Sequence, residues 1–115
     1  MTSYQTKIYV GLNDAISHEQ RFETEKYISI LQNVCRSYHV SFSMNQVSGG
    51  YMHENGDYVQ ENTLVLSLLD VPDEITRSIA EDLCVFFHQE TVLVTKSPSE
   101  IYYISEKLEE TEAHT

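Results

Sequence analysis

A hairpin signal at the centre of the chain constrains the fold most, because Asn55-Gly56 separates two runs of strand-forming residues. A two-residue turn of this kind needs positive φ angles, which asparagine and glycine adopt readily. Residues 40–46 alternate apolar and polar side chains, and residues 63–69 are almost continuously apolar. The alternation predicts a half-buried strand, and the apolar run predicts a central one.

Two amphipathic helices are predicted, one before this hairpin and one after it. Apolar side chains recur every three or four residues from about 21 to 37. The same spacing follows Pro72, whose neighbouring acids suit a helix start, and it involves Ile75, Ile79, Leu83 and Phe86. This period gathers apolar side chains on one helical face.

Further strands are predicted at residues 6–12, 90–95 and 101–104, the last two separated by a turn at residues 97–99. The element order is then β-α-β-β-α-β with an additional C-terminal strand. This is a ferredoxin-like α+β fold, with both helices on one sheet face. Residues 1–105 form one domain, and residues 106–115 form an acidic tail. The pair Gly49-Gly50 is interpreted as a bulge in the strand before the turn, and the alternative is that it lines a ligand pocket.

The charge balance limits the partners. Among 115 residues, eighteen acids face seven bases, for a net charge of −11. Such a chain repels phosphate backbones, so nucleic acid is not an expected partner. No apolar run is long enough to span a bilayer, and the start lacks a secretory pattern, so we expect a cytoplasmic protein with no membrane partner. Cys35 and Cys84 are expected to be reduced thiols.

The sheet face without helices is predicted to bind a partner, because its many tyrosine side chains would otherwise be exposed to solvent. The aromatic residues assigned to it are Tyr9, Phe42, Tyr51, Tyr58, Tyr102 and Tyr103. We expect either a homo-oligomeric interface or a pocket for a small ligand. Rings of Tyr51, Tyr58 and Phe87 are expected to stack on that ligand. Arg77 or Lys96 is expected to supply charge, and His88 is also expected to bind the ligand.

Two groups of polar residues are candidates for a metal site or a catalytic site. His53, Glu54, Asp57 and Glu61 surround the hairpin turn, but their spacing matches no recurring metal-ligand pattern. His88 follows the second helix, where a histidine commonly complements the helix dipole. We therefore predict no metal, no cofactor and no catalytic residue.

Three segments resemble a family of uncharacterised small bacterial and viral proteins. They are an aromatic opening strand that ends in Gly11, the pair Gly50-Tyr51 before the turn with Glu61 after it, and a Phe-x-Gln-Glu-Ser/Thr-Val-Leu pattern at residues 87–93. Tyr51 stands where tryptophan is expected. The resemblance implies a ferredoxin-like fold and transfers no catalytic residue.

These features together predict a non-enzymatic, homo-oligomeric binding protein that captures a small molecule. The ligand would be nucleotide-like, and the protein would resemble a phage anti-defence sponge that sequesters a signal. One alternative is an acidic inhibitor that docks on a basic protein partner. A second alternative is a small enzyme that uses His88 or His53 with a nearby carboxylate.

Overall fold

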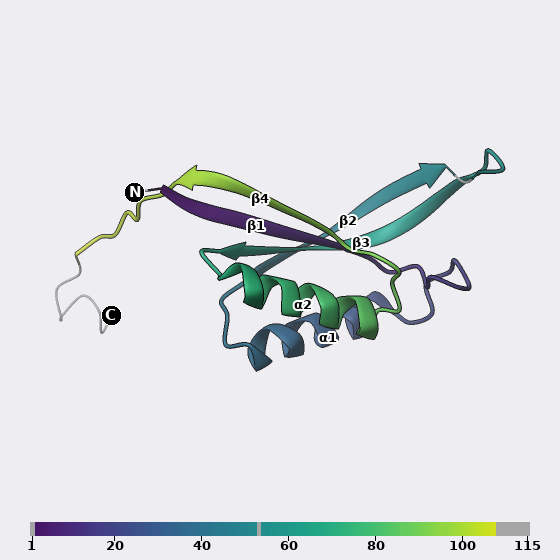
Figure 1. Cartoon of the computed structure of the whole chain (residues 1–115), viewed down its shortest axis with the longest axis horizontal. Coiled ribbons are helices and arrows are strands. Elements are labelled where there is room, and N and C mark those ends of the chain that lie inside the picture. Colours follow the sequence, from purple (N-terminus) through teal and green to yellow (C-terminus); the bar gives the residue numbers. More distant parts are fainter. Residues whose placement is uncertain (1, 53, 108–115) are drawn as a thin grey trace.

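The computed structural model describes residues 2–52 and 54–107. The elements follow in the order β1 (Thr2–Gly11), α1 (Thr24–Ser37), β2 (Ser43–Met52), β3 (Tyr58–Leu69), α2 (Asp73–Phe86) and β4 (Leu93–Glu100). The strands form one antiparallel sheet in the order β2-β3-β1-β4. Both helices cover the same face of that sheet (Figure 1). The predicted ferredoxin-like fold is confirmed.

The core lies between this sheet face and the two helices. Even-numbered residues of β1 and β3 point into it and are buried: Ile8, Val10, Leu64, Leu66 and Leu68. Buried side chains of the helices complete the core: Leu31 from α1, and Ile79 and Leu83 from α2. Burying one such side chain contributes about 1.5–3 kcal/mol. The helical period and the strand period of the sequence therefore meet in one apolar layer.

The hairpin of β2 and β3 extends beyond the rest of the sheet as an arm (Figure 1). β1 pairs with β3 only as far as Gly11 opposite Thr63, whereas β2 and β3 continue pairing to Met52 opposite Tyr58. The register is unbroken through Gly49-Gly50, so the predicted bulge is wrong.

The end of the arm also differs in detail from the predicted turn. Gly56 adopts a φ of 91°, whereas Asn55 does not have a positive φ. The Asn55 side chain instead accepts a hydrogen bond from the Asp57 N–H at 3.0 Å. One left-handed residue and one side-chain hydrogen bond therefore make this turn, in place of two left-handed residues.

β4 is longer than expected, and the predicted turn at residues 97–99 is wrong. The strand runs through Pro98, which lies opposite Tyr4. The N–H of Tyr4 donates to the Asp70 carboxylate at 2.8 Å, and its carbonyl accepts from the Asp70 N–H at 2.9 Å. Since Tyr4 bonds toward β3, the ladder between β1 and β4 needs no N–H from Pro98.

The predicted additional strand is also wrong, because residues 101–107 have no strand structure. Ile101 is half-buried, and the side chains of Tyr102, Tyr103 and Ile104 are exposed. Within the described ranges, neither helix is long and apolar enough to cross a membrane.

Candidate functional site

The sheet face without helices carries the odd-numbered residues of β1, β2 and β3, since paired antiparallel residues share a face. Tyr9 and Tyr51 lie on it, as predicted. Phe42 instead packs against the core. Tyr58 pairs with Met52 and so points to the opposite side of the arm. The open face is therefore less aromatic than the sequence suggested.

Glu61 lies on this open face, just beyond the point where β1 ends. Its carboxylate is packed so closely over Gly11 that a Cβ there would come within 2.4 Å of the Glu61 Cδ. One carboxylate oxygen accepts the N–H of Asn13 at 3.0 Å. Gly49 in β2 pairs with Glu61 in β3. A Cβ added to Gly49 would meet only a backbone oxygen, at 4.0 Å. The half-buried carboxylate therefore covers Gly11 on one side and leaves the backbone of Gly49 open on the other, where a ligand can approach.

A small cavity of about 240 Å³, lined largely by amide side chains, lies at the base of the arm. It is lined by Asn13, Gln20, Ser48, Gln60, Glu61 and Asn62. The Asn62 amide donates to the Gln20 side chain at 2.9 Å, and the Asn13 amide donates to the Gln60 carbonyl at 3.2 Å. Ser48, Gln60 and Asn62 are even-numbered, so their side chains belong to the side of the sheet opposite the Glu61 carboxylate. The cavity thus offers donors and acceptors of neutral hydrogen bonds on that side.

The loop after α2 is fastened to the loop after β1 by an acid–histidine pair. His88 adopts a left-handed φ of 52°, and its Nδ1 contacts the Asp14 carboxylate. Asp14 also accepts the N–H groups of Ile16 and Ser17, both at 3.0 Å. The Ser17 hydrogen bond, followed by the His88 contact, holds the pKa of Asp14 well below its ordinary value.

A second link joins the same two loops. The amide of Gln89 donates to the Asn13 carbonyl at 2.6 Å. Since Asn13 also donates to Glu61, the end of α2 is connected to the Glu61 carboxylate through one residue. Among the described residues, no group of three or more His, Cys, Asp or Glu side chains is placed to hold a metal ion.

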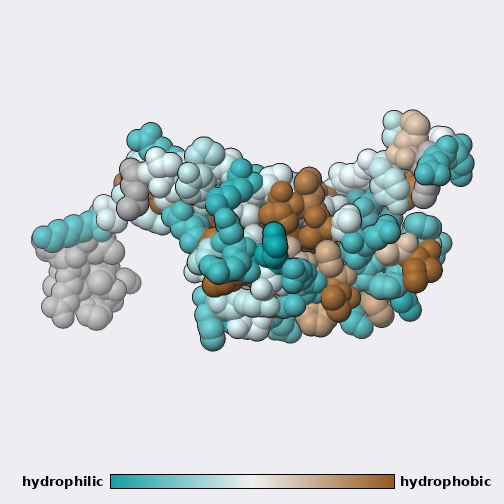
Figure 2. Space-filling model, viewed as in Figure 1, coloured by the Kyte–Doolittle hydropathy of each residue, from teal (hydrophilic) through white to brown (hydrophobic). Residues whose placement is uncertain are grey.

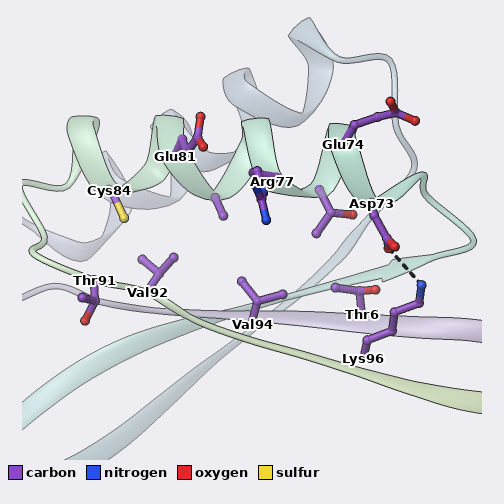
Figure 3. Close-up of a pocket in the computed structure, with 12 residues that line it drawn as sticks. Thr6, Asp73, Glu74, Arg77, Glu81, Cys84, Thr91, Val92, Val94 and Lys96 are labelled. Carbon is purple, nitrogen blue, oxygen red and sulfur yellow. Dashed lines mark hydrogen bonds and ion pairs between the residues drawn. The ribbon is translucent and has the colours of Figure 1, made fainter.

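A larger groove of about 900 Å³ lies between α2 and β4, on the side of the sheet that carries the helices (Figure 3). Arg77 and Lys96 both line it. The ammonium of Lys96 donates to the Asp73 carboxylate at 2.9 Å and lies 4.7 Å from the centre of the Tyr4 ring. Figure 2 shows a hydrophobic patch over β4 next to α2.

The predicted ligand-binding residues therefore fall in several places. Tyr51 and Tyr58 lie on the arm, and Arg77 and Lys96 lie in the groove. Phe87 is only 2% exposed, and its ring packs at 5.1 Å on Tyr27. Phe87 belongs to the core, so its ring is not available to stack on a ligand together with Tyr51.

Some of the site residues were not recognised from the sequence. His53 lies outside the described residues. The sequence indicates Glu61 only as one of the polar residues around the hairpin turn. Asp14 and Gly11 had no local signal, because their partners His88 and Glu61 lie 74 and 50 positions further along the chain.

No family model matches the chain, and no curated protein matches it significantly. Solved structures do match. A phage SAM lyase in complex with S-methyl-5′-thioadenosine has a TM-score of 0.65 and 19% identity, over 94% of this chain and 93% of that one. The same kind of enzyme without ligand gives 0.64 and 19%, over 95% and 94%. The periplasmic divalent cation tolerance protein CutA from Archaeoglobus fulgidus gives 0.53 and 10%, over 98% and 93%.

This likeness corrects the prediction that the chain is not an enzyme. The two phage SAM lyase structures resemble it over nearly the full length of both chains, and they are enzymes. At this level of identity the likeness establishes a shared fold. It also includes a phage protein with a bound small molecule, which agrees with the broad expectation of a small-ligand site.

Proposed function

We propose that this protein is a lyase that cleaves S-adenosylmethionine and releases S-methyl-5′-thioadenosine. The likeness to a phage SAM lyase that holds this thionucleoside supports the reaction. The observation that carries the proposal is the Glu61 carboxylate, which lies between two glycines on the open sheet face. It provides a negative charge, held by the Asn13 N–H, beside the open backbone of Gly49.

The charge of the protein favours this substrate over phosphorylated nucleotides. S-adenosylmethionine carries a sulfonium, an ammonium and a carboxylate, and so has a net positive charge. A chain with a net charge of −11 attracts such a ligand and repels phosphates. The expected nucleotide-like ligand thus becomes a nucleoside without phosphate. A role in phage anti-defence stays a prediction.

The chemistry needs few catalytic groups. When the bond between sulfur and the four-carbon chain breaks, the electron pair stays on sulfur, and a neutral thioether leaves without an added proton. The remaining fragment is completed by attack of its own carboxylate or by loss of a proton. In this proposal Glu61 binds the cationic part of the substrate and fixes its orientation, which lowers the barrier by positioning. The neutral part lies over Gly49, where an added Cβ would meet only a backbone oxygen at 4.0 Å.

The direct test is to incubate the purified protein with S-adenosylmethionine and measure S-methyl-5′-thioadenosine by mass spectrometry. Glu61→Gln should reduce its release by roughly a hundredfold, as expected for losing one well-placed electrostatic contact. The amide can still accept the Asn13 N–H, so the fold should persist. Glu25→Gln, on an exposed part of α1, is the matched control. If the folded wild-type protein releases no thionucleoside, the lyase proposal fails.

The expected homo-oligomer forms part of the same proposal. The open face carries apolar side chains, of which Val47 is 42% and Leu93 60% exposed, and residues 102–104 add a further exposed apolar segment. Self-association would cover these surfaces. Light scattering after gel filtration should give a mass that is a multiple of the 13.3 kDa chain. A monomer at all concentrations would exclude this part.

A further inference from the structure

Arg77 occupies an unusual position for an arginine on an acidic helix. Glu74 and Glu81 lie three residues before it and four after it, at the spacings where oppositely charged side chains pair on a helix. No ion pair joins Arg77 to either acid; the pairs among the described residues involve Arg21, His88 and Lys96. Figure 3 shows both acids directed away from β4 and Arg77 directed toward it. Its guanidinium therefore faces the groove between α2 and β4.

The neighbouring residue, Thr76, also lines this groove. Its side chain is 5% exposed, and its hydroxyl has no hydrogen-bond partner among the described residues. A buried polar group without a partner is uncommon in folded proteins, because it loses its hydration without compensation. A hydroxyl that lacks a partner within the described ranges and a cation thus both line this groove.

The rest of the groove limits the chemistry of a ligand. Ala80, Val92 and Val94 give it an apolar lining. At one end, Asp73 and Lys96 form an ion pair that holds the lysine in place. Glu74 and Glu81 line the groove as well, so a ligand with several negative charges would be repelled. A single carboxylate group with an apolar chain satisfies all of these conditions.

We propose that this groove is a second binding site, which takes a small monocarboxylate with an apolar chain. Arg77 and the Thr76 hydroxyl bind the carboxylate, and the chain lies on Ala80, Val92 and Val94. The site lies on the helix side of the sheet, whereas Glu61 lies on the open face. It therefore stands independently of the lyase proposal.

The test is a titration of ¹⁵N-labelled protein with hexanoate, followed by amide chemical shifts. Shifts should concentrate on α2 and β4. Acetate, which lacks the apolar chain, should bind roughly tenfold more weakly. Inorganic phosphate should bind more weakly than hexanoate at pH 7. Shifts spread over the whole surface, or phosphate binding as tightly as hexanoate, would overturn the proposal.

Two variants separate the groups involved. Arg77→Gln should weaken hexanoate binding by about tenfold or more, because a charge-assisted hydrogen bond is lost. Arg36→Gln makes the same change on α1 and should leave binding unchanged. Thr76→Val keeps the side-chain shape and should weaken binding severalfold while the protein stays folded. If both Arg77→Gln and Thr76→Val bind hexanoate like the wild type, the assigned site is wrong. Release of thionucleoside from S-adenosylmethionine serves as a separate readout, so a failure of the lyase proposal leaves this result unaffected.

Discussion

The two faces of the sheet differ in what their residues do. On the helix face, Ile8, Leu64 and Leu66 are completely buried and make only apolar contacts within the core. On the open face, the half-buried Glu61 carboxylate packs over Gly11, and Gly49 beside it carries no side chain. The first face provides stability, and the second carries the carboxylate that we propose as the binding group. Substitutions should separate these roles.

The largest loss of stability is expected on the helix face. Leu66→Ala removes a fully buried side chain from the central strand and leaves a cavity. Such changes cost about 2–5 kcal/mol. Urea unfolding followed by circular dichroism measures this loss. A cost below about 1 kcal/mol would show that this core is loosely packed.

A smaller loss of stability is expected at Asp14, in the loop after β1. Asp14 has a pKa well below its ordinary value of 3.8 in the folded protein, so its ionised form stabilises the native state. That contribution is present above about pH 4 and is lost as the pH falls toward the lowered value. Asp14→Asn should therefore reduce the free energy of unfolding clearly at pH 6 and less at pH 3, where part of this contribution is already lost.

The control for this pH dependence is Asp57→Asn on the hairpin tip, an exposed position. Urea unfolding of both variants and the wild type at each pH gives the comparison. A difference between wild type and Asp14→Asn that stays constant from pH 6 to pH 3 would show that the Asp14 carboxylate is not stabilised in this way.

Gly11→Ala should affect the open face with little loss of stability. The new methyl group would overlap the end of the Glu61 side chain, which is flexible and can move aside. We expect a change of about 1 kcal/mol or less in unfolding, together with a loss of thionucleoside release similar to that of Glu61→Gln. Unfolding curves and the release assay test the two halves separately. Full activity in Gly11→Ala would show that the position of Glu61 does not matter.

Gly49→Val should have the smallest effect on stability. The added side chain meets open space in the chain itself, and valine suits a strand better than glycine. Unfolding should change by less than about 1 kcal/mol. Because the side chain would cover the backbone beside Glu61, KM for S-adenosylmethionine should rise about tenfold. An unchanged KM would place the substrate elsewhere.

The sequence predicted the helix face better than the open face. Apolar periods of two and of three to four are visible locally, and they predict the first six elements in the correct order and most of the core. The contacts of Glu61 with Gly11 and of Asp14 with His88 join distant segments, and only the sheet register brings them together. The sequence predicts a turn at Pro98, whereas the residue lies within β4. A proline is tolerated there because Tyr4, opposite it on β1, directs its backbone hydrogen bonds to Asp70 after β3. Three separate segments create this environment, so a local sequence pattern does not predict it.

The prediction of a non-enzymatic protein rested on the absence of a nucleophile, a base and an orienting group. That criterion suits reactions in which the leaving group must be activated by the protein. A sulfonium substrate already carries an activated leaving group. A site for its cleavage can therefore consist of one carboxylate and a suitable shape, which leaves almost no motif in the sequence.

The position of Pro98 also bears on aggregation. Since Tyr4 directs its backbone groups toward Asp70, the nitrogen of Pro98 points to the outer edge of β4, where it offers no hydrogen for another strand. The opposite edge, β2, has no proline in its ten residues. The sheet thus has one edge open to strand addition and one interrupted edge. Such a pair opposes the endless edge-to-edge stacking that leads to fibrils, while β2 stays available for a single specific contact.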